Sequence, residues 1–411
     1  MLFRSYFQKL FADRIGGINY GKSTEIYKFE KIKRAKRKAL ADFPDRKLLD
    51  FGIGENDAPA APSVVKVMQE ECGLAKNRGY ADNGIPEFKQ AVARFMKRWF
   101  NVELDPDTQI IHGIGSKPAL AMIPQCFINP GDVTLMTVPG YPVAGTHTRY
   151  CGGEVYNLPL LPENDFYPDL DSIPADILKR AKLLVINYPN SPTGKYATAE
   201  FFEKVVAFAK KNEIVVVNDC AHIMLSHEDR PRSFLETPGA MDVGVETYSM
   251  SKGWNMIGWR LGWVCGNATL VRAYGDVKDN SDSGQFKAIQ LASAAALDDD
   301  SIPRATEVKY LRRLKKLVAM LKSVGFECEV PGGSYFLYTK APKGMADGTV
   351  FADAEAVSQF LITQCSICTV PWDNAGAYLR FSVTYVADDE AAEDQLMEET
   401  RQRLENLHFK F

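Results

Sequence analysis

The chain has 411 residues, of which 46% are hydrophobic and 25% charged, and its formal net charge is −3. Chains of this length usually fold into more than one domain. The composition is that of a globular protein, which argues against disordered, fibrous and membrane-embedded classes. The near-neutral charge provides no field that would gather nucleic acid or an anionic membrane, so we expect small-molecule chemistry in the cytoplasm. The eight cysteines are scattered and lack zinc-site spacing, so no metal site is expected.

Short β-branched runs alternate with turn residues and longer amphipathic segments between about residues 50 and 290. This alternation is typical of βαβ units, which build a mostly parallel sheet with helices on both faces. Thr198 is expected to cap one helix at its N-terminus. The expected strands span residues 109–111, 133–137, 183–186, 214–217 and 260–265, and the expected helices span 86–100, 117–127 and 198–212.

The pattern changes after about residue 300 to that of an α+β region. A basic amphipathic helix is expected at 305–324, a glycine-rich strand in PGGSYFLYTKAP, a helix near 352–364, a strand at 378–383 and a closing helix. We therefore predict an N-terminal arm and helix at 1–48 that belong to a small domain, a large domain at 49–295, and the rest of the small domain at 296–411.

The segment ETYSMSKGWNMIGWRLGWV places Lys252 in a glycine-punctuated loop before a strand. A lysine amine can attack an aldehyde carbon when it is partly desolvated or lies near another cation. Ser249 can turn its hydroxyl toward the same site, and the planar fork of Arg260 can grip a phosphate. Taken alone, the segment also fits a surface loop with a chance lysine.

Three further segments point to a bound cofactor. INYPNSPTG follows a predicted strand with turn residues that suit close approach of a ligand. In IVVVNDCAH, Asp219 ends the next strand, where a carboxylate can pair with a protonated ring nitrogen of an electron-sink cofactor. In HGIGSKPALAMIP, the N–H groups around Ser116 and Lys117 open a helix and can bind an anion such as phosphate.

Together these segments resemble the fold type I, class I/II aminotransferases that depend on pyridoxal 5′-phosphate (PLP), and SMSKGWNMIGWRLGW and PNSPTG are close to that family's diagnostic stretches. The resemblance implies an α/β fold whose large domain has a mostly parallel seven-stranded sheet, with a smaller α+β domain. It implies that Lys252 holds PLP as an imine and moves the proton between substrate and cofactor. Asp219 would pair with the pyridine nitrogen, and the phosphate would be surrounded by Ser116, Lys117, Ser249 and Arg260.

The resemblance also implies roles for residues outside these segments. Tyr141 matches an aromatic ring stacked on the cofactor, and Tyr80 matches a tyrosine that reaches the phosphate of the neighbouring subunit, which predicts a homodimer with shared sites. Arg380 matches the arginine that clamps the substrate α-carboxylate, which the backbone at Gly54 would also approach.

Two positions depart from the family pattern. The asparagine expected directly before the proline of the turn is Ser191, with Asn190 one place earlier, so either side chain could reach the ring oxygen of the cofactor. The tyrosine that usually touches the same oxygen is replaced by His222. A histidine here also occurs in PLP-dependent C–S lyases of the same fold type, so that reaction is kept as an alternative.

The substrate is indicated by weaker signals. Lys117 and the segment VKDNSDSGQFKAIQ look similar to the LL-diaminopimelate aminotransferases of lysine biosynthesis, with 2-oxoglutarate as acceptor. Asn83 and Lys117 are the residues expected to bind the distal end of that substrate. An aspartate-, alanine- or aromatic-type transaminase is the alternative within the family, and a PLP-binding protein without catalysis is the alternative outside it.

Overall fold

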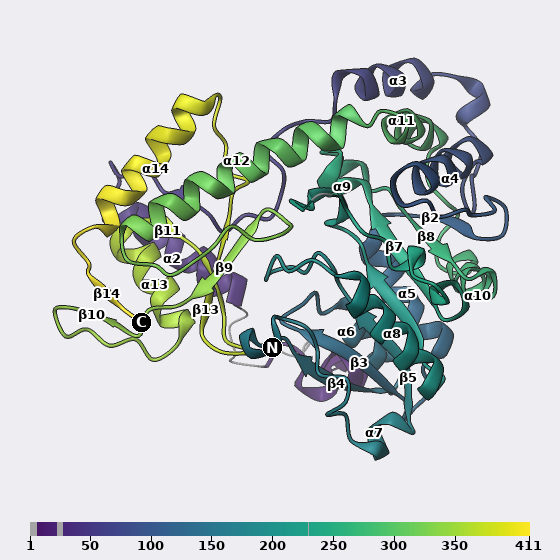
Figure 1. The fold of residues 1–411 in the computed structure, drawn as a ribbon, viewed down its shortest axis with the longest axis horizontal. Coiled ribbons are helices and arrows are strands. Elements are labelled where there is room, and N and C mark those ends of the chain that lie inside the picture. Colours follow the sequence, from purple (N-terminus) through teal and green to yellow (C-terminus); the bar gives the residue numbers. More distant parts are fainter. Residues whose placement is uncertain (1–5, 23–27, 229) are drawn as a thin grey trace.

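The computed structural model describes residues 6–22, 28–228 and 230–411. They form two lobes, a larger one built on a central sheet and a smaller one that contains both the early helix α2 (Lys28–Asp42) and the last quarter of the chain. The long helix α12 (Ser301–Ser323) runs from the larger lobe into the smaller one (Figure 1).

A seven-stranded sheet forms the centre of the larger lobe, in the strand order β2-β8-β7-β6-β5-β3-β4. All neighbours are parallel except those of β8, which is antiparallel to both β2 and β7, so the expected mostly parallel seven-stranded sheet is confirmed. The strands are β2 (Ile110–Gly113), β3 (Val133–Val138), β4 (Glu154–Pro159), β5 (Ala181–Ile186), β6 (Val215–Asp219), β7 (Gly244–Ser249) and β8 (Gly262–Gly266).

Both faces of this sheet are buried. Along β5, Leu184 and Ile186 belong to one apolar cluster whereas Leu183 and Val185 belong to another, as expected when successive side chains point to opposite faces. The helices of this lobe are α3 (Pro62–Cys72), α4 (Pro86–Phe100), α5 (Ser116–Phe127), α6 (Val143–Tyr150), α7 (Ala175–Leu178), α8 (Ala199–Asn212), α9 (Met250–Gly253), α10 (Ala268–Asp279) and α11 (Lys287–Leu297).

Local sequence signals set several helix ends. Helix α4 has the predicted bounds: Pro86 occupies its first turn, and Asn101, with φ of 56°, ends it in the left-handed conformation. The hydroxyl of Thr198 accepts the Phe201 N–H at 3.2 Å, so the predicted cap of α8 is confirmed.

The smaller lobe combines segments from both ends of the chain. Apolar residues of α2 pack against α13 and the strands that follow it. Besides α2 and α12, its helices are α13 (Ala354–Cys365) and α14 (Glu390–Leu404). Its strands are β1 (Leu49–Asp50), paired with β11 (Ile367–Cys368); β9 (Phe336–Lys340), β13 (Tyr378–Ser382) and β12 (Val370–Trp372), which form an antiparallel sheet; and β10 (Gly344–Met345), paired with β14 (Phe409–Lys410).

Several expected boundaries were wrong by one to four residues; for example, β2 spans 110–113 rather than 109–111, and β5 begins at Ala181 rather than at Leu183. Helix α12 begins at Ser301, four residues before the expected start, and β8 begins at Gly262 rather than at Arg260. Arg260 has a φ of 58°, outside strand geometry, and its guanidinium bonds the Ile257 carbonyl of the preceding turn at 2.9 Å. Within the described ranges, no helix is long and apolar enough to cross a membrane, and the cytoplasmic location stays a prediction.

Candidate active site

A cavity of about 400 Å³ lies where the large sheet meets the smaller lobe. The ends of β6 and β7, the loop after β5 and the start of α5 supply one side, and β9, β13 and the segment after β1 supply the other. Ligands of open α/β sheets bind at the carboxyl ends of the strands, as this cavity would allow. The lining residues are Phe29, Gly52, Gly54, Glu55, Ser116, Lys117, Tyr141, Asn187, Ser191, Asp219, Ala221, His222, Ser249, Ser251, Lys252, Ile257, Arg260, Tyr335, Phe336 and Arg380.

The amine of Lys252 lies inside this cavity. Its Nζ donates a hydrogen bond to the Gly54 carbonyl at 2.7 Å. Burial lowers the pKa of Lys252 from 10.5 to about 8; Glu55 opposes this shift, and the positive charges of Arg380 and Arg260 add to it. A much larger fraction of the amine is therefore neutral near neutral pH than for an ordinary lysine, as a nucleophile or a proton acceptor requires.

One end of the cavity is built to hold an anion. Gly115 precedes α5 with a φ of 82°, and no side chain caps the first turn of that helix, so its N–H groups at Ser116 and Lys117 face outward. The guanidinium of Arg260 lies against Gly115, where a Cβ would come within 2.6 Å of its Nη2. Arg260 also donates to the Ser251 hydroxyl at 3.3 Å, and Ser249 lies at the end of β7 beside it.

The buried carboxylate of Asp219 forms part of another side of the cavity. Asp219 ends β6, and its Oδ1 accepts the Ala221 N–H at 3.1 Å. Burial raises the pKa of Asp219 to about 6, although this N–H and the Thr247 hydroxyl act in the opposite direction. Neighbouring Asn187 donates to the Asp219 backbone carbonyl at 2.7 Å and accepts the Ser191 N–H at 2.8 Å, so it fixes the loop after β5 to the end of β6.

Arg380 brings a positive charge from β13 to the side of the cavity formed by the smaller lobe. It is 8% exposed, its Nη2 donates to the Gly52 carbonyl at 3.0 Å, and its guanidinium lies 4.1 Å from the centre of the Phe336 ring. Its Nε has no hydrogen-bond partner among the described residues. Burial lowers the pKa of Arg380 to about 10, and a carboxylate ligand would compensate this buried charge.

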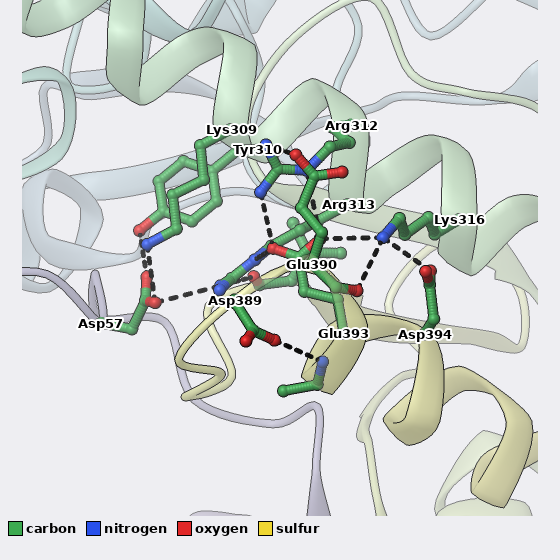
Figure 2. A network of polar contacts seen from close by, with 12 residues as sticks. Asp57, Lys309, Tyr310, Arg312, Arg313, Lys316, Asp389, Glu390, Glu393 and Asp394 are labelled. Carbon is green, nitrogen blue, oxygen red and sulfur yellow. Dashed lines mark hydrogen bonds and ion pairs between the residues drawn. The ribbon is translucent and has the colours of Figure 1, made fainter.

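The segment at 52–57 is anchored to α12 by a buried ion network (Figure 2). Asp57 accepts hydrogen bonds from Lys309 at 2.7 Å and Tyr310 at 3.0 Å, and it pairs with Arg313 at 3.1 Å. Arg313 in turn pairs with Glu393 of α14 at 2.7 Å. The backbone that faces Lys252 and Arg380 is thus tied to two helices of the smaller lobe.

Most of the residues predicted from the sequence line this one cavity, but three do not. Tyr80 is 82% exposed, and the Asn83 amide is held by Asp279 at 2.8 Å. The side chain of Asn190 turns into its own loop, where Oδ1 accepts from the Thr193 hydroxyl at 2.8 Å, whereas Ser191 lines the cavity. Neither Tyr80 nor Asn83 lines the cavity of its own chain.

Several lining residues were not predicted from the sequence. Tyr335 donates to the Gly54 carbonyl at 2.7 Å and packs edge to face against His222. Asn187, Glu55 and Phe336 were missed as well. Asn187 stands three residues before Asn190 in the same turn, so its position directly after the predicted strand was the signal that could have identified it.

These groups fit PLP. An anion site, a buried carboxylate and a lysine of low pKa surround one cavity, and PLP carries a phosphate, a basic ring nitrogen and an aldehyde that match them. Arg380 adds a second positive charge, and its Nε has no hydrogen-bond partner among the described residues, so a further anion such as a carboxylate fits beside it.

The chain matches the family model for aminotransferase class I and II over residues 46–398. It is 52% identical to the LL-diaminopimelate aminotransferase of Methanocaldococcus jannaschii and 49% identical to that of Methanococcus maripaludis, with 99% of each chain covered in both alignments. Among solved structures, substrate-bound BacF from Bacillus subtilis superposes with a TM-score of 0.84 at 30% identity, covering 95% of this chain and 97% of BacF.

Proposed function

The chain belongs to the class I and II aminotransferases, and from this premise we propose that it uses PLP to move an amino group from LL-diaminopimelate to 2-oxoglutarate in lysine biosynthesis. The choice of substrate rests on the 52% identity to an LL-diaminopimelate aminotransferase across 99% of both chains. The cavity supplies the supporting chemistry, because Lys252, Asp219, Arg260 and Arg380 all line it.

PLP would supply an aldehyde that takes up the amino group and a ring that withdraws electrons from the reacting carbon. The start of α5, Ser249 and Arg260 would hold its phosphate, and the Asp219 carboxylate would keep its ring nitrogen protonated. Tyr141 would cover the ring, and Ser191 and His222 would face its edge.

Residues of this chain would then bind the substrate and move its proton. Arg380 would grip the α-carboxylate in a bidentate pair, with the Gly54 backbone close by. Lys252, whose pKa is lowered to about 8, would take the proton from the substrate Cα while its amine is neutral and return it later as an acid. Lys117, at the exposed edge of the cavity, would meet the distal carboxylate of a long substrate.

We also propose that the enzyme is a homodimer in which Tyr80 and Asn83 serve the partner's site, and that its domains divide at residues 48/49 and 295/296, with β1 at the start of the large domain paired to β11 of the smaller lobe. The exposure of Tyr80 supports the first proposal, because this ring is 82% exposed in a single chain. The long α12, which joins the two lobes (Figure 1), supports a division in this part of the chain.

A C–S lyase is the second candidate, because His222 occupies the place of the usual tyrosine and lines the cavity. The experiment records the visible spectrum of the PLP-loaded protein while LL-diaminopimelate, glutamate, aspartate, phenylalanine or cystathionine is added. Loss of the cofactor band with LL-diaminopimelate and glutamate, but with none of the others, is the expected result. Release of thiol and pyruvate from cystathionine while the band persists would make the protein a lyase instead.

A further inference from the structure

Ser334 lies directly behind the active-site cavity in a rigid and unusual backbone conformation. It is fully buried and has a φ of 69°, a left-handed value that serine rarely adopts. Its N–H donates to the Leu225 carbonyl at 2.8 Å, and its own carbonyl accepts from His227 Nε2 at 2.7 Å. The other ring nitrogen of His227 lies 2.8 Å from Glu307 on α12. The backbone on both sides of the Ser334 side chain is therefore held in place, and with it the direction of the Cα–Cβ bond.

That hydroxyl meets the ring of His222. The Ser334 Oγ lies 3.2 Å from His222 Nδ1, and both residues are buried. Either group could be the donor of this hydrogen bond, depending on the tautomer of His222. If Nδ1 donated, the hydroxyl proton would be left in the interior with no acceptor among the described residues, which costs about 1–3 kcal/mol. Donation from the hydroxyl to Nδ1 satisfies both groups.

The charge of His222 agrees with this direction. Burial lowers the pKa of His222 to about 3, and the positive charges of Lys252 and Arg380 act in the same direction. The ring is therefore neutral at neutral pH and carries a single proton. A neutral imidazole that accepts at Nδ1 must hold its proton on Nε2. No hydrogen bond of the described residues occupies Nε2, and the ring lines the cavity.

We propose that Ser334 is a positioning residue for His222: its hydroxyl fixes the imidazole as the Nε2–H tautomer, which then presents one directed donor to the ring oxygen of bound PLP. The target rests on the proposed function, because the phosphate is assigned to the start of α5 and the substrate carboxylate to Arg380. A donor at the ring oxygen stabilises negative charge there, as the tyrosine of the family pattern would. The pair thus gives a physical role to the replacement of that tyrosine by histidine.

The tautomer can be tested without cofactor or activity. The chain has five histidines, so nitrogen-15 spectra of histidine-labelled apo-protein are simple enough to assign with a His222→Gln variant. The expected spectrum of the unaltered protein shows His222 protonated on Nε2 alone. Ser334→Ala should remove this preference, and Ser334→Gly, which suits the left-handed backbone, should do the same if the alanine variant folds poorly. A proton on Nδ1 of His222 in the unaltered protein would overturn the proposal.

The contact with the cofactor needs a second readout. The visible band of bound PLP changes with pH, and a donor that holds charge on the ring oxygen shifts this transition to lower pH. Ser334→Gly should therefore move the transition to higher pH. Ser358→Ala is the matched control, because Ser358 is also fully buried and donates to the Thr369 carbonyl at 2.9 Å, in the smaller lobe.

An unchanged transition in Ser334→Gly, or an equal shift in Ser358→Ala, would contradict the assigned role. If the protein binds no PLP at all, the proposed function fails, whereas the apo-protein spectra still decide the tautomer. The two failures are therefore distinguishable.

Discussion

The Nζ of Lys252 and the carbonyl oxygen of Gly54 are 2.7 Å apart, although 198 positions separate them in the chain. Gly54 lies in the segment that Asp57 anchors to α12, and the same carbonyl also accepts from Tyr335. The reactive amine of the larger lobe is therefore hydrogen-bonded to a backbone segment that ion pairs connect to helix α12. Any change in the charges around this contact should alter the reactivity of the amine.

The first prediction concerns the pH dependence of cofactor uptake. Only the neutral amine attacks an aldehyde, and the pKa of Lys252 is lowered to about 8. The rate at which apo-protein takes up PLP should rise with pH and level off above about 8. Arg380→Met removes a charge that lowers this pKa and should move the profile to higher pH, whereas Glu55→Gln removes a charge that raises it and should move the profile to lower pH. Shifts in the same direction would refute the electrostatic account.

The second prediction concerns Gly115. A Cβ at this position would lie 2.6 Å from Arg260 Nη2, and the φ of 82° is unfavourable for alanine. Gly115→Ala should displace Arg260 from the anion site and weaken PLP binding about tenfold or more, since a hydrogen bond to a charged group contributes about 1.5–3 kcal/mol. The dissociation constant is measured by equilibrium dialysis. Gly325→Ala is the control. Gly325 also has a positive φ, of 97°, but a Cβ added there would meet no atom within 4 Å.

The third prediction concerns substrate affinity. Arg380→Lys keeps a charge but loses the planar fork that grips a carboxylate. Loss of one charged hydrogen bond costs about 1.5–3 kcal/mol, so KM for the amino donor should rise about 10- to 100-fold. Binding of PLP itself should change little. Arg94→Lys is a surface control, because Arg94 also makes a bidentate pair, with Asp298. A KM in Arg380→Lys equal to that of the control would remove Arg380 from the substrate site.

Local signals predicted much of the fold and many residues of the site. Pro86 and Thr198 marked helix starts, and short β-branched apolar runs marked the strands, because these features act within a few residues. Tyr335 could not be found in this way, since its hydrogen bond to Gly54 spans 281 positions. Asn190 was misleading because its side-chain oxygen accepts from Thr193 of its own turn, and this orientation depends on local geometry rather than on residue type.

The fourth prediction concerns stability. Arg313 is 1% exposed and pairs with both Asp57 and Glu393. Arg313→Met leaves these two buried carboxylates with fewer partners, which should lower the free energy of unfolding by about 3–5 kcal/mol. Lys322→Met breaks an exposed pair with Glu329 and should cost less than about 1 kcal/mol. Urea unfolding of the two variants measures the difference, and equal losses would show that the network contributes no more than a surface pair.

The last prediction tests the shared site. Tyr80 is 82% exposed and does not line the cavity of its own chain. In a dimer of Lys252→Ala and Tyr80→Phe chains, one site would carry both defects, whereas the other would combine an intact Lys252 with the partner's intact tyrosine. Each homodimer should have low activity, and coexpressed chains with separate affinity tags should regain up to half of the normal activity per heterodimer. Activity should return only when heterodimers form. Homodimers that are mixed under conditions without subunit exchange therefore serve as the control and should stay inactive. If purified heterodimers show only the mean of the two homodimer activities, Tyr80 acts within its own chain or not at all.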